Sequence, residues 1–205
     1  MRRWILVVAA AGWIAGCAPQ TSVPNGPTIN TALLPTGTAI PAAEQPQVQP
    51  TLEPAMPAMA LSSSSFLEGG EIPPIHTCDG DDTSPDLVWG NLPQGTASLA
   101  LVFDDPDAGG WVHWVVYDLP PDGGRLPGGL RSELPAGGQI GANTWGNREY
   151  GGPCPPSGSH RYVFTLYALD AVLGLPPGAT AEGLAAAVEG HVLATAELTG
   201  IYERR

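Results

Sequence analysis

The chain has 205 residues, of which 43% are apolar, and 20 acidic against 8 basic residues give it a formal charge of −12. A chain of this length and composition can bury the core of one domain, but no basic surface is present to attract nucleic acid phosphates. All eight basic residues are arginine, so lysine-based Schiff-base chemistry and a lysine-type phosphate loop are also excluded.

Residues 1–16 are typical of an export signal. Two arginines precede an uncharged apolar run of 12 residues, 4–15, which fits a secretory signal and is shorter than the roughly 20 residues of a membrane-spanning helix. The run ends in Ile-Ala-Gly-Cys, which resembles the cleavage box of bacterial lipoproteins and implies that Cys17 is lipidated. We therefore expect an exported protein anchored to a bacterial membrane. The alternatives are a plain secretory signal or a cytoplasmic protein with an apolar start.

Residues 17–65 predict a tether. After Cys17 this segment has nine prolines, no aromatic or basic residue, and only Glu44 and Glu53 as charges. Because it lacks both apolar bulk and a repeating period, we expect an extended, partly polyproline linker. The composition changes near Phe66, and residues 66–205 are expected to form the folded domain.

Alternating or continuous β-formers, bounded by Gly/Pro clusters, predict three central strands of one sheet. These are Ser98–Asp104, Trp111–Asp118 and Arg161–Leu169. Shorter runs at Leu87–Trp89 and near Gln139–Gly141 are expected at sheet edges, whereas His191–Tyr202 fits either a strand or a helix. The clearest helix signal is Thr180 as N-cap, a short apolar face and a closing Gly190. The pattern predicts a mainly β fold, a β-sandwich with one or two short helices.

Histidines and carboxylates gather in three islands at strand ends, where loops on a rigid sheet can converge on one cleft. The islands are residues 76–85, 104–114 and 151–162. Asp105 and His113 bracket a short loop, so we expect the carboxylate to approach the imidazole and to favour its protonated, anion-binding form. His160 and Tyr162 share one strand face and offer a second imidazole and a phenol donor. Pro155 and Pro156 would form a stiff wall without backbone N–H groups.

Four stretches, DDPDA, WVHW, YGGPCPP and HRYVFTLYALD, resemble the phosphatidylethanolamine-binding protein family over residues 66–205, and within it the bacterial branch related to Raf kinase inhibitor proteins. The resemblance implies a large antiparallel sheet packed on a smaller one, with a small anion pocket for phosphate-type head groups. It also implies the ligand-binding residues, which are Asp105, Asp107, His113, Gly152, Pro155, Pro156, His160 and Tyr162. The family pattern DPDAP ends here in Gly109, which would loosen the loop.

Other residues favour structural roles. Asp107 is expected to order its turn and Arg161 to pair with a neighbouring carboxylate, while His76 and His191 are interpreted as structural or exposed. The two Trp residues that flank His113, Trp111 and Trp114, are expected beside the site.

Once Cys17 is lipidated, Cys78 and Cys154 remain as an even pair in an exported domain. A disulfide between them is predicted, with two buried thiols as the alternative. The run Asp79-Gly80-Asp81-Asp82 has oxygen ligands that would suit calcium, but it lacks the glutamate of an EF-hand loop, and turn formation is the favoured interpretation. The histidines and cysteines show no zinc spacing. No metal or cofactor is expected.

These observations favour a binding protein, tethered to a membrane, for a small anionic ligand such as a phospholipid head group or a phosphorylated metabolite. The family resemblance also permits inhibition of a protein partner, such as a protease or kinase. A third hypothesis is weak hydrolase activity with His113 or His160 as general base. No catalytic residue is assigned, because Ser159 and His160 are adjacent in a strand and point to opposite faces.

Overall fold

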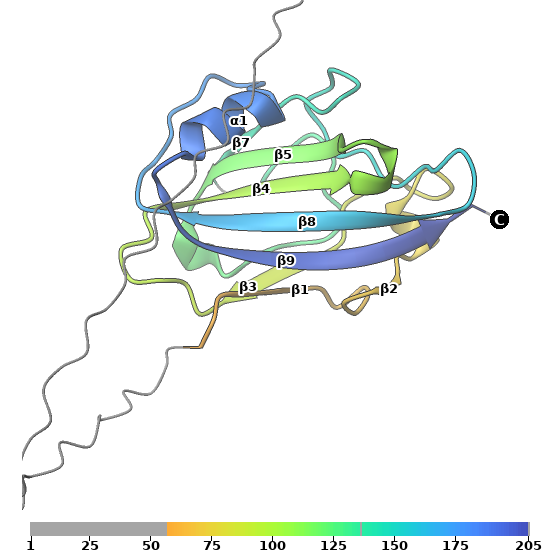
Figure 1. The fold of residues 1–205 in the computed structure, drawn as a ribbon, viewed down its shortest axis with the longest axis horizontal. Helices are drawn as coiled ribbons and strands as arrows, with labels where there is room; N and C mark the ends of the chain where they lie inside the picture. The colour runs from red at the N-terminus through yellow and green to blue at the C-terminus, as the bar shows by residue number, and fades with distance from the viewer. Residues whose placement is uncertain (1–56, 136, 205) are drawn as a thin grey trace, which may run out of the picture. The chain divides into compact units, whose positions relative to one another are not determined.

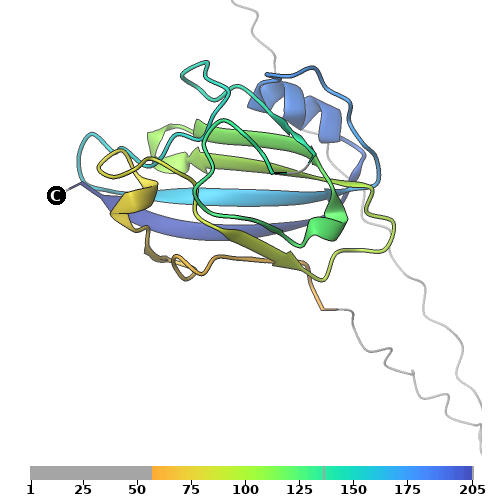
Figure 2. The same ribbon diagram turned by 180° about the vertical axis from the view of Figure 1, so that it is seen from behind.

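The computed structural model describes residues 57–135 and 137–204. The predicted export signal, Cys17 and most of the predicted tether lie outside the described residues. Within them the chain forms a six-stranded sheet, a three-stranded sheet and one α-helix (Figure 1). Figure 2 shows the same domain from behind, with the smaller sheet and the long loops in front of the larger sheet.

The larger sheet has the strand order β2-β9-β8-β4-β5-β7. Its strands are β2 (Gly70–Glu71), β4 (Ser98–Asp105), β5 (Trp111–Leu119), β7 (Gln139–Ile140), β8 (Ser159–Leu169) and β9 (Val192–Glu203). The three predicted central strands lie side by side as β8, β4 and β5, and the ambiguous C-terminal segment is a strand. All pairs in this sheet are antiparallel except β2 with β9, which is parallel and so departs from the expected antiparallel sheet.

The smaller sheet has the order β1-β3-β6, with β1 at Ala60–Ser62, β3 at Leu87–Gly90 and β6 at Arg125–Leu126. β3 is therefore the central strand of this sheet rather than an edge. β1 lies within the segment predicted as tether, so the folded part begins earlier than residue 66. Leu61 is buried in the core, and the following serines donate hydrogen bonds to the Asp86 carboxylate. One apolar residue among Ser and Ala gives too weak a period to signal this strand.

The main core lies between the two sheets and is rich in aromatic rings. Phe103 of β4 is fully buried and stacks on Phe164 of β8, with ring centroids 3.8 Å apart. Alternation along β8 and β9 places every second side chain in this core. The outer face of the larger sheet is covered at one end by α1 (Ala181–Val188), whose Leu184 and Val188 pack there.

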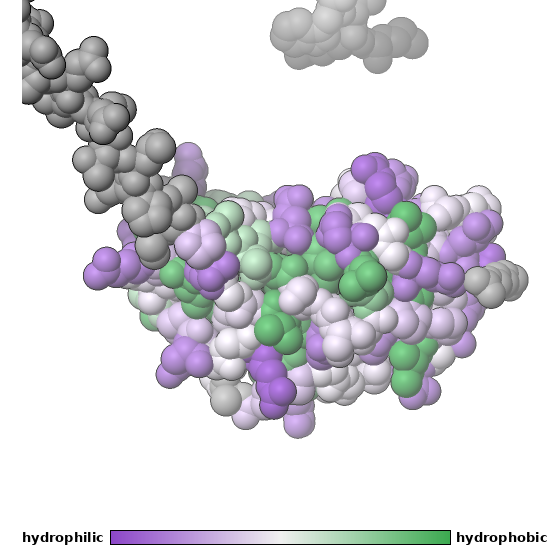
Figure 3. Space-filling model, turned by 90° about the horizontal axis from the view of Figure 1, so that it is seen from below, coloured by the Kyte–Doolittle hydropathy of each residue, from purple (hydrophilic) through white to green (hydrophobic). Residues whose placement is uncertain are grey.

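The helix follows its sequence signals. The Thr180 side chain accepts a hydrogen bond from the Gly183 amide, and Gly190 has a positive φ of 82° just beyond the helix. No helix in the described residues is long and apolar enough to cross a membrane. Figure 3 shows apolar and polar side chains interspersed on the face seen from below.

Candidate functional site

A cavity of about 250 Å³, here termed the ligand cavity, lies where β4 ends and β5 begins. It is lined by Asp105, Ala108, Trp111, His113, Trp145, Cys154, Pro155, Pro156 and Tyr162. Two of the three predicted islands thus meet in one cavity, and five of the eight predicted ligand residues line it. The convergence follows from the sheet order, because β8 pairs with β4 and β4 pairs with β5.

Asp105 organises the turn that closes one side of the ligand cavity. Its side chain is nearly buried, and Oδ1 accepts a hydrogen bond from the Ala108 amide at 3.0 Å. Oδ2 accepts from Nδ1 of His160 at 2.7 Å. The carboxylate is therefore already engaged through both of its oxygens.

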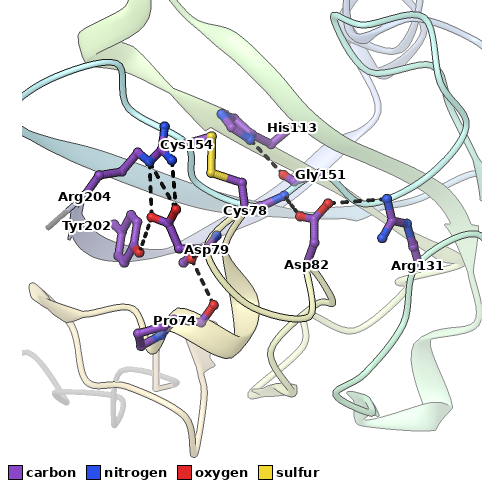
Figure 4. The surroundings of a disulfide bond; sticks show 12 residues. Pro74, Cys78, Asp79, Asp82, His113, Arg131, Gly151, Cys154, Tyr202 and Arg204 are labelled. Atoms are coloured by element: carbon purple, nitrogen blue, oxygen red, sulfur yellow. Dashed lines mark hydrogen bonds and ion pairs between the residues drawn. A yellow bond between two sulfur atoms is a disulfide. The ribbon is translucent and has the colours of Figure 1, made fainter.

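His113 does not pair with Asp105, contrary to the expectation from the sequence. Its Nδ1 donates to the Gly151 carbonyl at 2.8 Å, which fixes the tautomer and leaves Nε2 without that proton (Figure 4). Burial lowers the pKa of His113, although the Gly151 carbonyl and the negative charge of Asp105 oppose this. The ring is thus held in its neutral form more strongly than the sequence indicated, because the loss of hydration outweighs the neighbouring carboxylate.

The Tyr162 ring is next to both imidazoles. Its ring centroid is 5.4 Å from that of His113 and 6.4 Å from that of His160. The hydroxyl is buried and makes no well-formed hydrogen bond within the part of the chain that the structure describes, although the Asp105 carboxylate and the Cys154 backbone lie close enough to act on its pKa. Burial, together with the charge of Asp105, raises the pKa of this phenol, so it stays a neutral donor.

Three predicted ligand residues do not line the ligand cavity. His160 contacts the cavity residues Asp105 and Tyr162 but does not itself line the cavity. Asp107 binds Arg161 through Nη2 at 2.7 Å and through the Arg161 amide at 2.8 Å, and these bonds lower the pKa of Asp107 to about 2. The Gly152 amide donates to Asp82 Oδ1 at 2.6 Å, and the residue lines a second cavity of about 230 Å³.

Trp145 lines the ligand cavity although it was not among the expected residues, whereas Trp114, which was expected beside the site, does not line it. Trp114 is fully buried in the core. Trp145 is 48% exposed in a loop, and its ring meets those of Trp111 and His113 edge-on at 5.4 and 5.1 Å. An isolated Trp in a loop of Gly and Asn was the available signal, since an exposed aromatic residue has no packing reason to be there.

The structure joins Cys78 and Cys154 by a disulfide, as predicted. The nearby acidic run serves protein contacts, since Asp79 binds Tyr202 and Arg204 while Asp82 binds the Gly152 amide. Of the other two histidines, His76 is buried and bonds to the Thr83 carbonyl, whereas His191 is exposed and pairs with Asp170.

Comparison with known proteins identifies the family. The model of the family described as phosphatidylethanolamine-binding protein matches residues 62–203. The chain belongs to the phosphatidylethanolamine-binding protein family. Among relatives of this family, a UPF0098 protein from Methanothermobacter thermautotrophicus is 49% identical over 150 residues, covering 71% of this chain and 99% of the relative. A relative from Mycobacterium tuberculosis has a lipoprotein name, LppC. It is 42% identical over 157 residues, which cover 75% of this chain and 76% of the relative.

Solved structures of the family agree with the fold. A Chlamydia trachomatis homologue of phosphatidylethanolamine-binding proteins has a TM-score of 0.68 and 41% identity, covering 72% of this chain and 99% of that one. An Escherichia coli protein described as a new member of the mammalian family has the same TM-score and 31% identity, covering 73% of this chain and all of that one.

Gly109 follows the turn Pro106–Ala108 with a φ of 71°, which proline cannot adopt. The loop at the ligand cavity therefore has a backbone here that a proline at position 109, as expected from the resemblance, would not permit.

We predict that Gly152→Ala destabilises the domain by about 1–3 kcal/mol, the cost of overpacking. An added Cβ would meet the His76 carbonyl oxygen and, at 2.7 Å, the Thr77 Cα, which are backbone atoms that cannot turn aside. Urea unfolding measures the effect. Gly183→Ala in the exposed part of α1 is the control and should stabilise by about 0.5–1 kcal/mol. Equal stability of Gly152→Ala and the unaltered protein would contradict this close packing.

Proposed function

We propose that the domain binds a small anion of the phosphate type in the ligand cavity. The observation that carries this proposal is the buried Tyr162 hydroxyl, a donor in the cavity wall that makes no well-formed hydrogen bond among the described residues. A buried donor left unpaired costs free energy that a ligand oxygen can recover. At about 250 Å³ the cavity is below the range typical of drug-sized ligands, so a head group fits better than a whole lipid.

The charge arrangement favours an anion over a cation, although one wall residue is a carboxylate. Both oxygens of Asp105 already accept hydrogen bonds, one of them from His160, so they are poorly placed to coordinate an incoming cation. Protonation of His113 would add a second donor, and Trp111 and Trp145 supply apolar walls that strengthen the few polar contacts. Because the whole chain is acidic, affinity must come from these directed donors rather than from the general field.

The proposal places the domain outside the cytoplasm on a lipid anchor at Cys17. It is supported by the apolar run and cleavage box of the sequence, and by the lipoprotein name of the Mycobacterium tuberculosis relative. Membrane-fraction mass spectrometry tests it: Cys17→Ser should release the protein from membranes, and an unchanged distribution would contradict the anchor.

Titration with inorganic phosphate and with phosphoethanolamine tests the ligand. Trp111 and Trp145 line the cavity, so their fluorescence should change on binding. We predict that Tyr162→Phe weakens binding by about 10–100-fold, the value of one hydrogen bond to a charged group. Tyr167→Phe is the matched control, because Tyr167 packs on the opposite face of the same strand. A flat response of the unaltered protein to both ligands would overturn the proposal.

A further inference from the structure

The Cys78–Cys154 disulfide lies at the surface between two cavities. Both cysteines are exposed. Cys154 lines the ligand cavity, and it also lines the second cavity together with Cys78. Figure 4 shows the bond with the Asp79–Arg204 pair on one side and the Asp82–Arg131 pair on the other. An exposed disulfide is open to attack by a thiolate, whereas a buried one is not.

The disulfide ties down the wall of the ligand cavity. Residues 151–153 are also held by hydrogen bonds, from the Gly151 amide to the His113 carbonyl, from the Gly152 amide to Asp82, and from the Cys78 amide to the Pro153 carbonyl. No hydrogen bond within the described part of the chain involves residues 155–158. This segment includes Pro155 and Pro156, which form part of the cavity wall. Its position is therefore held by the neighbouring covalent link, by the packing of the buried Pro155 and by the start of β8 at Ser159.

We propose that the Cys78–Cys154 disulfide is a thiol–disulfide exchange site whose reduction by a dithiol opens the ligand cavity. The effect on ligand affinity rests on the proposed function, whereas the exchange itself does not. Both cysteines line the second cavity, so the bond can be reached from there when the ligand cavity is filled, with Cys78 as one of the two sulfurs open to attack.

The exchange takes two balanced steps. A thiolate of the dithiol attacks Sγ of Cys78, forming a mixed disulfide as the bond to Cys154 breaks, and Cys154 leaves as a thiolate that takes a proton. The second thiol of the reactant, once deprotonated, displaces Cys78 and closes its own disulfide. Two electrons and two protons reach this protein, and the dithiol is oxidised.

The structure indicates that the change stays local. The aromatic core and the pairing of β4 with β8 do not involve the sulfur atoms, so the β-sandwich should persist while residues 154–158 are released and the hydrogen bonds of the adjoining residues 151–153 loosen. Loss of the wall removes the preorganisation of the cavity, which weakens binding.

The test treats the full chain with dithiothreitol without denaturant, alkylates it, and locates the label by peptide mass mapping. We expect label on both Cys78 and Cys154 while the far-UV circular dichroism keeps its β signal. Phosphate affinity should fall about tenfold or more and should return on reoxidation. The double variant Cys78→Ser, Cys154→Ser should bind weakly and should not respond to dithiothreitol.

Three results would overturn the inference: labelling that needs denaturant, reduction that leaves phosphate affinity unchanged, and loss of the β signal on reduction. If the oxidised protein binds no phosphate, the proposed function fails, and the exchange site is judged by labelling and hydrogen exchange. The amides of Cys78 and Gly152 are hydrogen-bonded, and reduction should speed their exchange about tenfold while β4 and β8 stay protected. Unchanged exchange of both amides would also count against the site.

Discussion

Replacing Phe103 by alanine is expected to lower the free energy of unfolding by about 3–5 kcal/mol and to weaken the proposed anion binding as well. Phe103 is fully buried, stacks on Phe164 at 3.8 Å and on Tyr150 at 5.6 Å, and so fills the middle of the main core. Its ring also lies 5.2 Å from His113 and 6.1 Å from Tyr162, the two polar rings of the ligand cavity. The substitution therefore removes core packing and the support of the site together.

Urea unfolding and phosphate titration at low temperature, where the variant is still folded, separate the two effects. Val102→Ala on the same strand is the control, because Val102 packs against the smaller cluster on the outer face and is only partly buried. We expect that control to cost less than about 1.5 kcal/mol and to leave binding unchanged. A Phe103→Ala variant that unfolds at reduced urea but binds phosphate normally would show that the site does not depend on this ring.

The sequence predicts those parts of the fold that repeat a local period. β4, β5 and β8 are long and bounded by Gly and Pro, so their type and approximate limits are readable. The sequence does not predict β1 and β6, because strands of two or three residues show no alternation of apolar and polar side chains. They form only by pairing with β3. The parallel β2–β9 pair likewise depends on a long-range contact between Gly70 and Gly200.

The ligand cavity is predictable where a motif marks it and not where tertiary contacts decide. Asp105, His113 and Tyr162 stand at strand ends and carry recognisable chemistry, so their convergence was expected. The hydrogen-bond partner of each group was not expected. Asp105 and His113 are eight residues apart, yet Asp105 bonds to His160 and His113 bonds to the Gly151 carbonyl. Neither hydrogen bond has a local sequence signal, because the partners are 55 residues apart in the first case and 38 in the second.

The state of His113 leads to the second large effect, a dependence of anion affinity on pH. Burial lowers the pKa of His113 in the free protein, so the ring is neutral near pH 7. An anion in the ligand cavity stabilises the imidazolium and raises its pKa. Between the free and bound values, affinity should rise by up to about tenfold for each unit of pH decrease, and it should be flat outside that window.

Sulfate is the suitable probe, because its own charge is constant between about pH 5 and 8 while phosphate titrates there. Sulfate affinity should increase as pH falls, and His113→Gln should abolish this increase while its amide can still donate to the Gly151 carbonyl. His160→Gln is the matched control and should retain the pH dependence. A flat profile in the unaltered protein, or a slope that survives in His113→Gln, would show that His113 takes no proton on binding.

Protonation of His113 also links anion binding to the free energy of unfolding. The unfolded chain holds His113 at an ordinary pKa of about 6.5, above its lowered value in the fold. As pH falls, the unfolded state therefore takes up this proton at a higher pH than the folded state does. The contribution of His113 to folding stability is fully present above about pH 6.5, and it is lost as pH falls towards the folded pKa. A bound anion raises the folded pKa and narrows that gap, so sulfate should protect the protein against unfolding more at pH 5.5 than at pH 8. Thermal unfolding at both pH values measures this, and equal protection at both would contradict proton-linked binding.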